Sequence, residues 1–168
     1  DMLAFLPVLT RMTKAPLMID STDSDVIEEA LKLCQGKSVI NSINLEDGEE
    51  RFESVVPLAR RYGAALVVGC IDEDPDDGMA VTVERKLEIA ERSYDLLTNK
   101  YGVPPEDIIF DPLVFPVGTG DEKYTSSAAA TIDGVKAIHD RFPQCGTVLG
   151  ISNVSFGLPP AGREVLNS

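Results

Sequence analysis

Five short apolar runs recur along the chain, and a polar turn followed by a helical pattern separates each run from the next. The runs are residues 16–19, 38–40, 64–68, 108–110 and 147–151. They are continuous and rich in β-branched side chains, as is typical of strands that are buried on both faces. Strands that alternate with helices form a parallel sheet with crossover helices. The pattern therefore predicts an α/β fold with about five parallel strands.

Four helices are expected between these runs. Their apolar stripes cover residues 26–34, 52–62, 83–97 and 130–142. Gly36 and Gly63 stand where a glycine commonly ends a helix. Asp47 and Glu50 have the D-x-x-E spacing of a capping box, which predicts the start of the second helix. The third helix is expected to begin near Thr82.

Composition narrows the classes of function. The formal net charge is −13, and the Lys and Arg residues are scattered, whereas a nucleic-acid binder needs them clustered along a groove. We therefore expect neither a nucleic-acid partner nor a membrane surface. No run reaches the roughly 18 apolar residues of a membrane span, and the chain does not open on the basic segment of a signal peptide, which predicts a cytoplasmic protein. Three distant cysteines without a CxxC pair predict reduced thiols.

A polar residue closes each apolar run. These residues are Asp20, Asn41, Asp72, Asp111 and Asn153. Ligands of parallel α/β folds bind beyond the carboxyl ends of the strands, so we expect these side chains to meet at one mouth. They offer many acceptors, a few donors and no fixed positive charge. Because the chain also lacks GxGxxG and GxxxxGK[ST] motifs, a neutral, nitrogen-rich heterocycle suits the site better than a phosphorylated ligand.

Several segments around these positions resemble the pterin-binding motifs of cobalamin-dependent methionine synthases. They are residues 16–21, 39–43, 60–65, 84–86, 107–112 and 150–157. Dihydropteroate synthases and corrinoid methyltetrahydrofolate methyltransferases are similar in fold. The resemblance implies a (β/α)₈ TIM-type barrel that binds 5-methyltetrahydrofolate as substrate and passes its N5 methyl group to cob(I)alamin carried by another domain. It also implies a homocysteine-binding partner domain, zinc only on another module, and no metal on this chain.

The resemblance extends to individual residues. Asp20, Asn41 and Asp111 match the positions that hold the pterin ring, and Asn153 matches the position that hydrogen-bonds near N5. Asn153 is the catalytic candidate, because its amide can rotate to serve N5 with or without a proton. The resemblance gives Asp72 no role.

The length departs from the family pattern. A barrel of this type has about 250 residues and eight strands, whereas five strands are predicted here, and residues 1–14 resemble the end of a preceding helix. We expect residues 1–168 to be one pterin-binding domain fragment that lacks both ends of the barrel and is inactive in isolation.

Other functions remain open at this stage. The alternatives are a stand-alone methyltetrahydrofolate:corrinoid methyltransferase, a dihydropteroate synthase relative, and a non-catalytic pterin-binding module or inert fragment. A dihydropteroate synthase must bind a pyrophosphate, for which only Lys123 and Arg163 stand near the mouth in the sequence. The acidic residues 72–78 lack EF-hand register, which requires glycine at position six and glutamate at position twelve. They predict a solvated loop, and His139, remote from every strand end, is expected to be an exposed residue.

Overall fold

The computed structural model describes residues 2–120, 122–124 and 126–168. Within them, five strands form one sheet in the order β1-β2-β3-β4-β5, and every strand is parallel to its neighbours. The strands are β1 (Met18–Asp20), β2 (Val39–Leu45), β3 (Ala65–Asp72), β4 (Ile108–Asp111) and β5 (Gly146–Thr147). The α/β fold with five parallel strands is confirmed.

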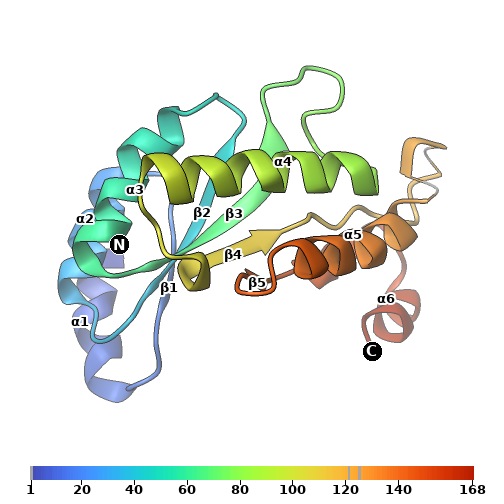
Figure 1. Ribbon diagram of the computed structural model, residues 1–168. Helices are drawn as coiled ribbons and strands as arrows, with labels where there is room; N and C mark the ends of the chain where they lie inside the picture. Colours follow the sequence, from blue (N-terminus) through green and yellow to red (C-terminus); the bar gives the residue numbers. More distant parts are fainter. Residues whose placement is uncertain (1, 121, 125) are drawn as a thin grey trace.

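The α-helices are α1 (Met2–Met12), α2 (Ser24–Leu33), α3 (Glu50–Tyr62), α4 (Val83–Asp95), α5 (Ser127–Arg141) and α6 (Pro160–Asn167). The shorter elements are the π-helix η1 (Leu96–Lys100) and the 3-10 helices η2 (Pro105–Asp107), η3 (Glu122–Tyr124) and η4 (Ile151–Ser155). α2 packs against α1 and α3, and α4 packs against α5. α1 and α6 lie at opposite ends of the sheet (Figure 1). None of the helices in the described ranges is both long and apolar enough to cross a membrane.

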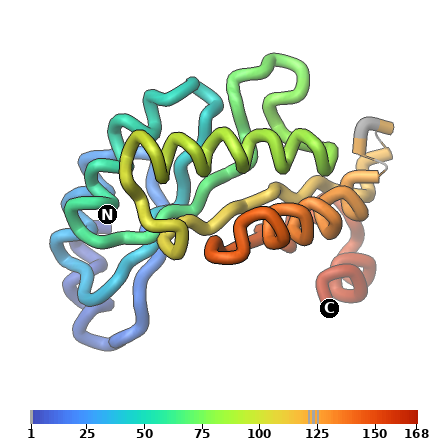
Figure 2. Tube along the Cα trace, viewed as in Figure 1, coloured from blue at the N-terminus to red at the C-terminus, as the bar shows by residue number. Residues whose placement is uncertain are grey.

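The two faces of the sheet differ because side chains alternate along each strand. The buried core between sheet and helices contains strand residues Ile19, Ile40, Ile43, Leu66, Val68, Ile108 and Phe110. Alternate residues point away from α2–α5, and we call that side the inner face. It carries Asp20, Asn41, Gly69 and Asp111. Figure 2 shows the chain passing from strand to helix and back as it runs from blue to red.

Four predicted strands lie where the apolar runs place them, and two of these, β2 and β3, extend at least four residues beyond their predicted ends. β2 continues to Leu45 through polar residues, because a register irregularity between Ile40 and Ile43 turns both of these side chains toward the core. Asn41 therefore lies within β2, and the prediction that it closes the strand is wrong. The apolar pattern does not predict this extension, because the additional strand residues include polar side chains.

The fifth strand is much shorter than predicted. Only Gly146 and Thr147 pair with β4, instead of residues 147–151. The Val148 N–H still donates to the carbonyl of Phe110 at 2.9 Å, and the chain then turns into η4. Asn153 is consequently in a 3-10 helix, and its predicted place at a strand end is wrong.

Most predicted helices are confirmed. α2, α4 and α5 lie on the stripes at 26–34, 83–97 and 130–142, and α1 lies within the helix expected over residues 1–14, of which Asp1 is outside the described residues. Thr82 caps α4, since its Oγ1 accepts the N–H of Arg85 at 3.3 Å. Gly63 ends α3 with a φ of 67°.

Two predicted helix ends are wrong. α3 begins at Glu50 and no side chain caps it, so Asp47 and Glu50 form no capping box. Gly48, between them, has a φ of 65°, which is left-handed and interrupts any helix starting at Asp47. Gly36 also has a positive φ, of 73°, but lies in the turn beyond the cap of α2 at Cys34.

Candidate functional site

Asp20 and Asn41 lie side by side on the inner face. Asp20 ends β1, and its Cα partner across the sheet is Asn41. Both line an open hollow of about 310 Å³, together with Ser21, Thr22, Ser42, Asn44, Glu46, Asp47 and Arg51. Asp20 is exposed and Asn41 is half-buried. The peptide bond between Asn41 and Ser42 is cis. The fold thus brings together a carboxylate and a carboxamide that are 21 residues apart in the sequence.

A cation, Arg51, also lines this hollow. Its guanidinium donates to the carbonyls of Thr22 at 2.7 Å, Ser21 at 2.8 Å and Ser42 at 3.4 Å. Burial lowers the pKa of Arg51, and Asp23 partly opposes the shift. The expectation of a mouth without fixed positive charge is wrong. The turns that follow the strands contain no basic residue, whereas Arg51 reaches the mouth from the first turn of α3.

Asp111 lies at the end of β4, opposite Gly69 of β3. On the other side of Gly69 stands Asn44, and a Cβ on Gly69 would lie 3.7 Å from that of Asn44. Asn44, Gly69 and Asp111 therefore form a row across three strands, further along the sheet than Asp20 and Asn41. Gly69 is the floor of this row; it is buried and carries no side chain, so β3 places no side chain of its own directly between the carboxamide and the carboxylate. The side chain of Ile71 lies close by, with its Cδ1 3.8 Å from the position of a Cβ on Gly69.

The Asp111 carboxylate is half-buried, and within the described part of the chain only one of its two oxygens accepts a hydrogen bond. Its Oδ1 accepts the N–H of Leu113 at 2.9 Å, while its Oδ2 has no hydrogen-bond partner among the described residues. Burial raises the pKa of Asp111, although the Leu113 N–H and the charge of Lys86 act in the opposite direction. One oxygen of the carboxylate is thus available to accept a hydrogen bond from a ligand.

Asn153 lies beside the loop that carries Asp111. Its Nδ2 donates to the carbonyl of Val114 at 3.3 Å, and the neighbouring Val154 carbonyl accepts the N–H of Val117 at 3.0 Å. The side chain is exposed, and its Oδ1 accepts no hydrogen bond within the described part of the chain. Asn153 and its neighbour are therefore joined to the loop that follows Asp111 by hydrogen bonds, and not by strand pairing.

Asp72, unlike Asp111, has no carboxylate oxygen left free to accept a hydrogen bond from a ligand. It ends β3 as expected, but Arg85 Nη2 donates to its two oxygens at 2.8 and 2.9 Å, and the carboxylate is buried. Among the described residues, no group of three or more His, Cys, Asp and Glu side chains is arranged to hold a metal ion. The acidic loop after Asp72 is exposed at residues 73–77, and His139 is exposed on α5.

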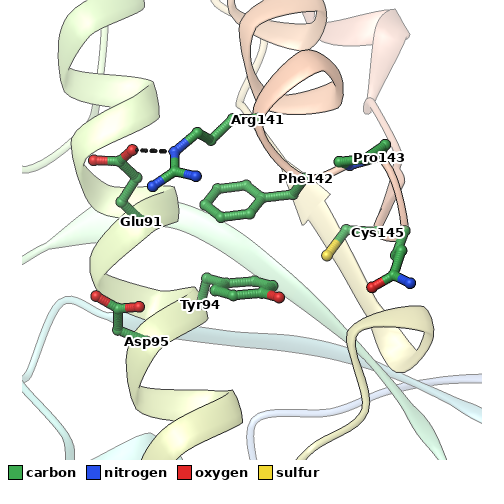
Figure 3. A pocket seen from close by; sticks show the side chains of 8 residues that line it. Glu91, Tyr94, Asp95, Arg141, Phe142, Pro143 and Cys145 are labelled. Atoms are coloured by element: carbon green, nitrogen blue, oxygen red, sulfur yellow. Dashed lines mark hydrogen bonds and ion pairs between the residues drawn. The ribbon is translucent and has the colours of Figure 1, made fainter.

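Another hollow lies between α4 and α5, at the other end of the strands. It has a volume of about 350 Å³ and is lined by residues of α4 and of the segment that enters β5. Arg141 bonds Glu91 across it at 2.7 Å, and the rings of Tyr94 and Phe142 stack with centroids 4.3 Å apart (Figure 3). Because Phe142 precedes β5, this hollow lies at the amino ends of the strands, away from the candidate site.

A parallel sheet with crossover helices, and with amides and carboxylates near the carboxyl ends of its strands, is typical of barrel-type α/β proteins, which bind small molecules at the mouth. The comparisons with known proteins specify the family. The family model for pterin binding enzymes matches residues 1–168, and the chain belongs to that family.

Among curated proteins, the chain is similar to methionine synthases. It is 42% identical to that of Mycobacterium leprae (strain TN) and 40% identical to that of Mycobacterium tuberculosis (strain ATCC 25618 / H37Rv), in each case over 171 aligned residues. Both alignments cover 100% of this chain and 14% of the relative. The chain thus spans about a seventh of the length of these two relatives.

Among solved structures, the chain resembles dihydropteroate synthases. A sulfonamide complex of the Yersinia pestis enzyme gives a TM-score of 0.61 at 14% identity and covers 98% of this chain and 58% of that one. The Thermus thermophilus enzyme in complex with 4-aminobenzoate gives a TM-score of 0.58 at 23% identity, covering 98% of this chain and 65% of that one. At these identities the likeness concerns the fold, and it agrees with a partial TIM-type barrel.

Proposed function

We propose that residues 1–168 are the pterin-binding domain of a cytoplasmic methionine synthase. In this proposal the domain binds 5-methyltetrahydrofolate and presents its N5 methyl group to cob(I)alamin on another domain, with homocysteine and zinc bound elsewhere in the enzyme. The family membership and the 40–42% identity to methionine synthases support it. The observation that carries it is the free oxygen of Asp111 beside Gly69, which adds no side chain between Asp111 and Asn44.

Each polar group has a task that its chemistry allows. Carboxylates accept hydrogen bonds from ring N–H and exocyclic NH₂ groups, which the proposal assigns to Asp20 and Asp111. Asn41 both donates and accepts, which suits a ring nitrogen next to an oxo group. Arg51 is occupied by three backbone carbonyls, so we assign it to support of the loops and not to a pyrophosphate.

Asn153 is assigned to the methyl-transfer step. A tertiary amine becomes a better leaving group when N5 gains positive character, and an amide beside N5 can accept from the protonated form or donate to the neutral form. Within the described part of the chain, the side chain of Asn153 makes one hydrogen bond, the long one to Val114 at 3.3 Å. Rotation of the amide therefore breaks a single weak contact. Cobalamin supplies the methyl acceptor when its own domain docks.

Calorimetry with 5-methyltetrahydrofolate tests the proposal on the full chain, by which we mean the complete enzyme that contains residues 1–168. We expect Asp111→Asn to weaken binding by about 10- to 100-fold, the value of a hydrogen bond to a charged group. Asn153→Ala should lower the rate of methyl transfer to free cob(I)alamin by about 100-fold and change affinity much less. His139→Ala, an exposed site remote from the mouth, is the matched control. Absence of binding by the wild-type full chain, or unchanged affinity in Asp111→Asn, contradicts the proposal.

A further inference from the structure

Lys86 is a fully buried lysine on α4, with no accessible surface. Its Nζ donates to the carbonyl of Ala80 at 2.8 Å and to that of Pro112, and lies 3.5 Å from the carbonyl of Leu113. A buried ammonium group is costly unless its donors are satisfied, and backbone carbonyls satisfy them here. Two of these three carbonyls belong to the residues that directly follow Asp111. Lys86 thus holds the loop after β4 from the helix side of the sheet.

This contact reaches the carboxylate through one residue, Leu113. Its N–H donates to Asp111 Oδ1 at 2.9 Å, and its carbonyl accepts the Thr131 hydroxyl of α5 at 3.0 Å. Leu113 has a φ of 65°, a left-handed conformation that a leucine adopts only when its surroundings hold it there. Lys86 and Thr131 therefore hold the turn from two helices, and the turn occupies one oxygen of Asp111 and leaves the other free.

The packing of α5 leaves space for the side chain of Lys86 next to Gly134. A Cβ on Gly134 would lie 2.6 Å from Lys86 Cδ, so only glycine permits the present side-chain path. The lysine aliphatic chain fills the space beside Gly134, while Nζ stands 5.1 Å from the centre of the Phe115 ring. Lys86 is consequently fixed by both the helix that carries it and the helix that packs on it.

Few charges act on Lys86. Among the described residues, the titratable neighbours are Cys70 of β3 and Asp111 of β4, while α5 contributes Thr131 and Gly134, which do not titrate. Burial raises the pKa of Cys70 to about 12, so the thiol is neutral at physiological pH. Burial lowers the pKa of Lys86 to about 8, which leaves the ammonium mostly charged at pH 7. Asp111 is therefore the anion that Lys86 faces.

We infer that Lys86 is a positioning residue, which holds the turn after β4 so that Asp111 presents one free carboxylate oxygen to the pterin ring. The inference rests on the proposed function, because it assigns the free oxygen to the pterin. Lys86 itself is buried behind the turn and acts through Asp111.

The first test is Lys86→Gln in the full chain, because glutamine keeps two N–H donors and removes the charge. We expect affinity for 5-methyltetrahydrofolate at pH 7 to fall about tenfold. The pH at which affinity is lost on acidification should also move upward, since Asp111 loses a neighbour that lowers its pKa. Lys136→Met, an exposed lysine on α5, is the control and should retain wild-type affinity and pH dependence.

A double-mutant comparison separates positioning from general support. In an Asp111→Asn background we expect Lys86→Gln to cause little further loss of affinity, because both substitutions disable the same carboxylate. Additive losses, or a wild-type acid midpoint in Lys86→Gln, overturn the inference. Failure of the wild-type full chain to bind would instead defeat the proposed function. Wild-type binding that Asp111→Asn weakens and Lys86→Gln leaves unchanged defeats this inference alone.

A second variant covers the case in which Lys86→Gln does not fold, as judged by circular dichroism. Thr131→Val removes the other donor to the Leu113 carbonyl and leaves every charge in place. We expect it to weaken binding a few-fold with the acid midpoint unchanged, because the turn loosens while Lys86 still faces Asp111. Wild-type affinity for 5-methyltetrahydrofolate in Thr131→Val shows that the turn does not control the Asp111 carboxylate. A shift in the acid midpoint of binding shows that the midpoint does not report the charge of Lys86, and it contradicts the role assigned to that charge.

Discussion

At the scale of single residues, two cations near the mouth, Arg51 and Lys86, bind backbone carbonyls and not carboxylates. Arg51 holds the turns after β1 and β2, and Lys86 holds the turn after β4. Because these cations are satisfied by the backbone, Asp20 and Asp111 retain oxygens that can accept hydrogen bonds from a ligand. Asp72 shows the opposite case, since Arg85 engages both of its oxygens. The choice of partner therefore separates ligand-facing carboxylates from structural ones.

Arg51→Met tests the support that this cation gives. The substitution removes the hydrogen bonds to Ser21, Thr22 and Ser42, and we expect the free energy of unfolding to fall by about 1–3 kcal/mol. Pterin affinity should fall about tenfold as the turns beside Asp20 loosen. Urea unfolding and calorimetry measure the two effects. Arg61→Met, an exposed partner of Glu28, should cost less than about 1 kcal/mol; an equal loss from both variants contradicts the expectation.

At the scale of elements, helix starts illustrate when a local motif is decisive. Thr82 has β-region dihedrals and its hydroxyl accepts the Arg85 N–H, so the predicted start of α4 is confirmed. At α3 the D-x-x-E spacing is present, but Gly48 adopts a left-handed φ of 65° and helical geometry begins only at Glu50. A capping motif thus requires backbone dihedrals that the flanking turn must permit.

The two motifs lead to different expectations for alanine substitution. Thr82→Ala removes a hydrogen bond to the helix backbone and should lower the free energy of unfolding by about 1 kcal/mol. Asp47→Ala removes no cap and should change it by less than about 0.5 kcal/mol, the usual effect at such surface sites. Urea denaturation of both variants checks the difference. A larger loss of unfolding free energy from Asp47→Ala than from Thr82→Ala would show that Asp47 does cap α3.

At the scale of the whole molecule, the site depends on residues that three strands place in one row. Asn44, Gly69 and Asp111 come from β2, β3 and β4, and the irregularity in β2 sets Asn44 beside Gly69 on the inner face. Gly69 is buried and adds no side chain between the polar groups, which favours a flat ring as the ligand of this row. This feature is a property of the sheet and of no single strand.

Gly69→Leu tests that floor. The nearest neighbours of an added Cβ lie 3.7–3.9 Å away, which is ordinary van der Waals contact, so the fold should persist. The remainder of the leucine side chain would lie between Asn44 and Asp111, and we expect 5-methyltetrahydrofolate affinity to fall by at least about 100-fold. Gly162→Leu on α6, where the nearest neighbour of an added Cβ is also 3.7 Å away, is the control. Near-wild-type affinity in Gly69→Leu would place the ligand elsewhere.

The sequence by itself determined the parallel α/β architecture, most helix positions, and the places of Asp20, Asp72 and Asp111 at strand ends, because hydrophobic periodicity and the polar residue that closes a strand are local patterns. Tertiary structure alone decided which of these groups are free. The extension of β2, the pairing of Asp72 with Arg85, and the backbone contacts of Arg51 and Lys86 join segments up to 30 residues apart in the chain. Such partners are selected by packing and by the cost of burying an unsatisfied charge, which no local pattern records.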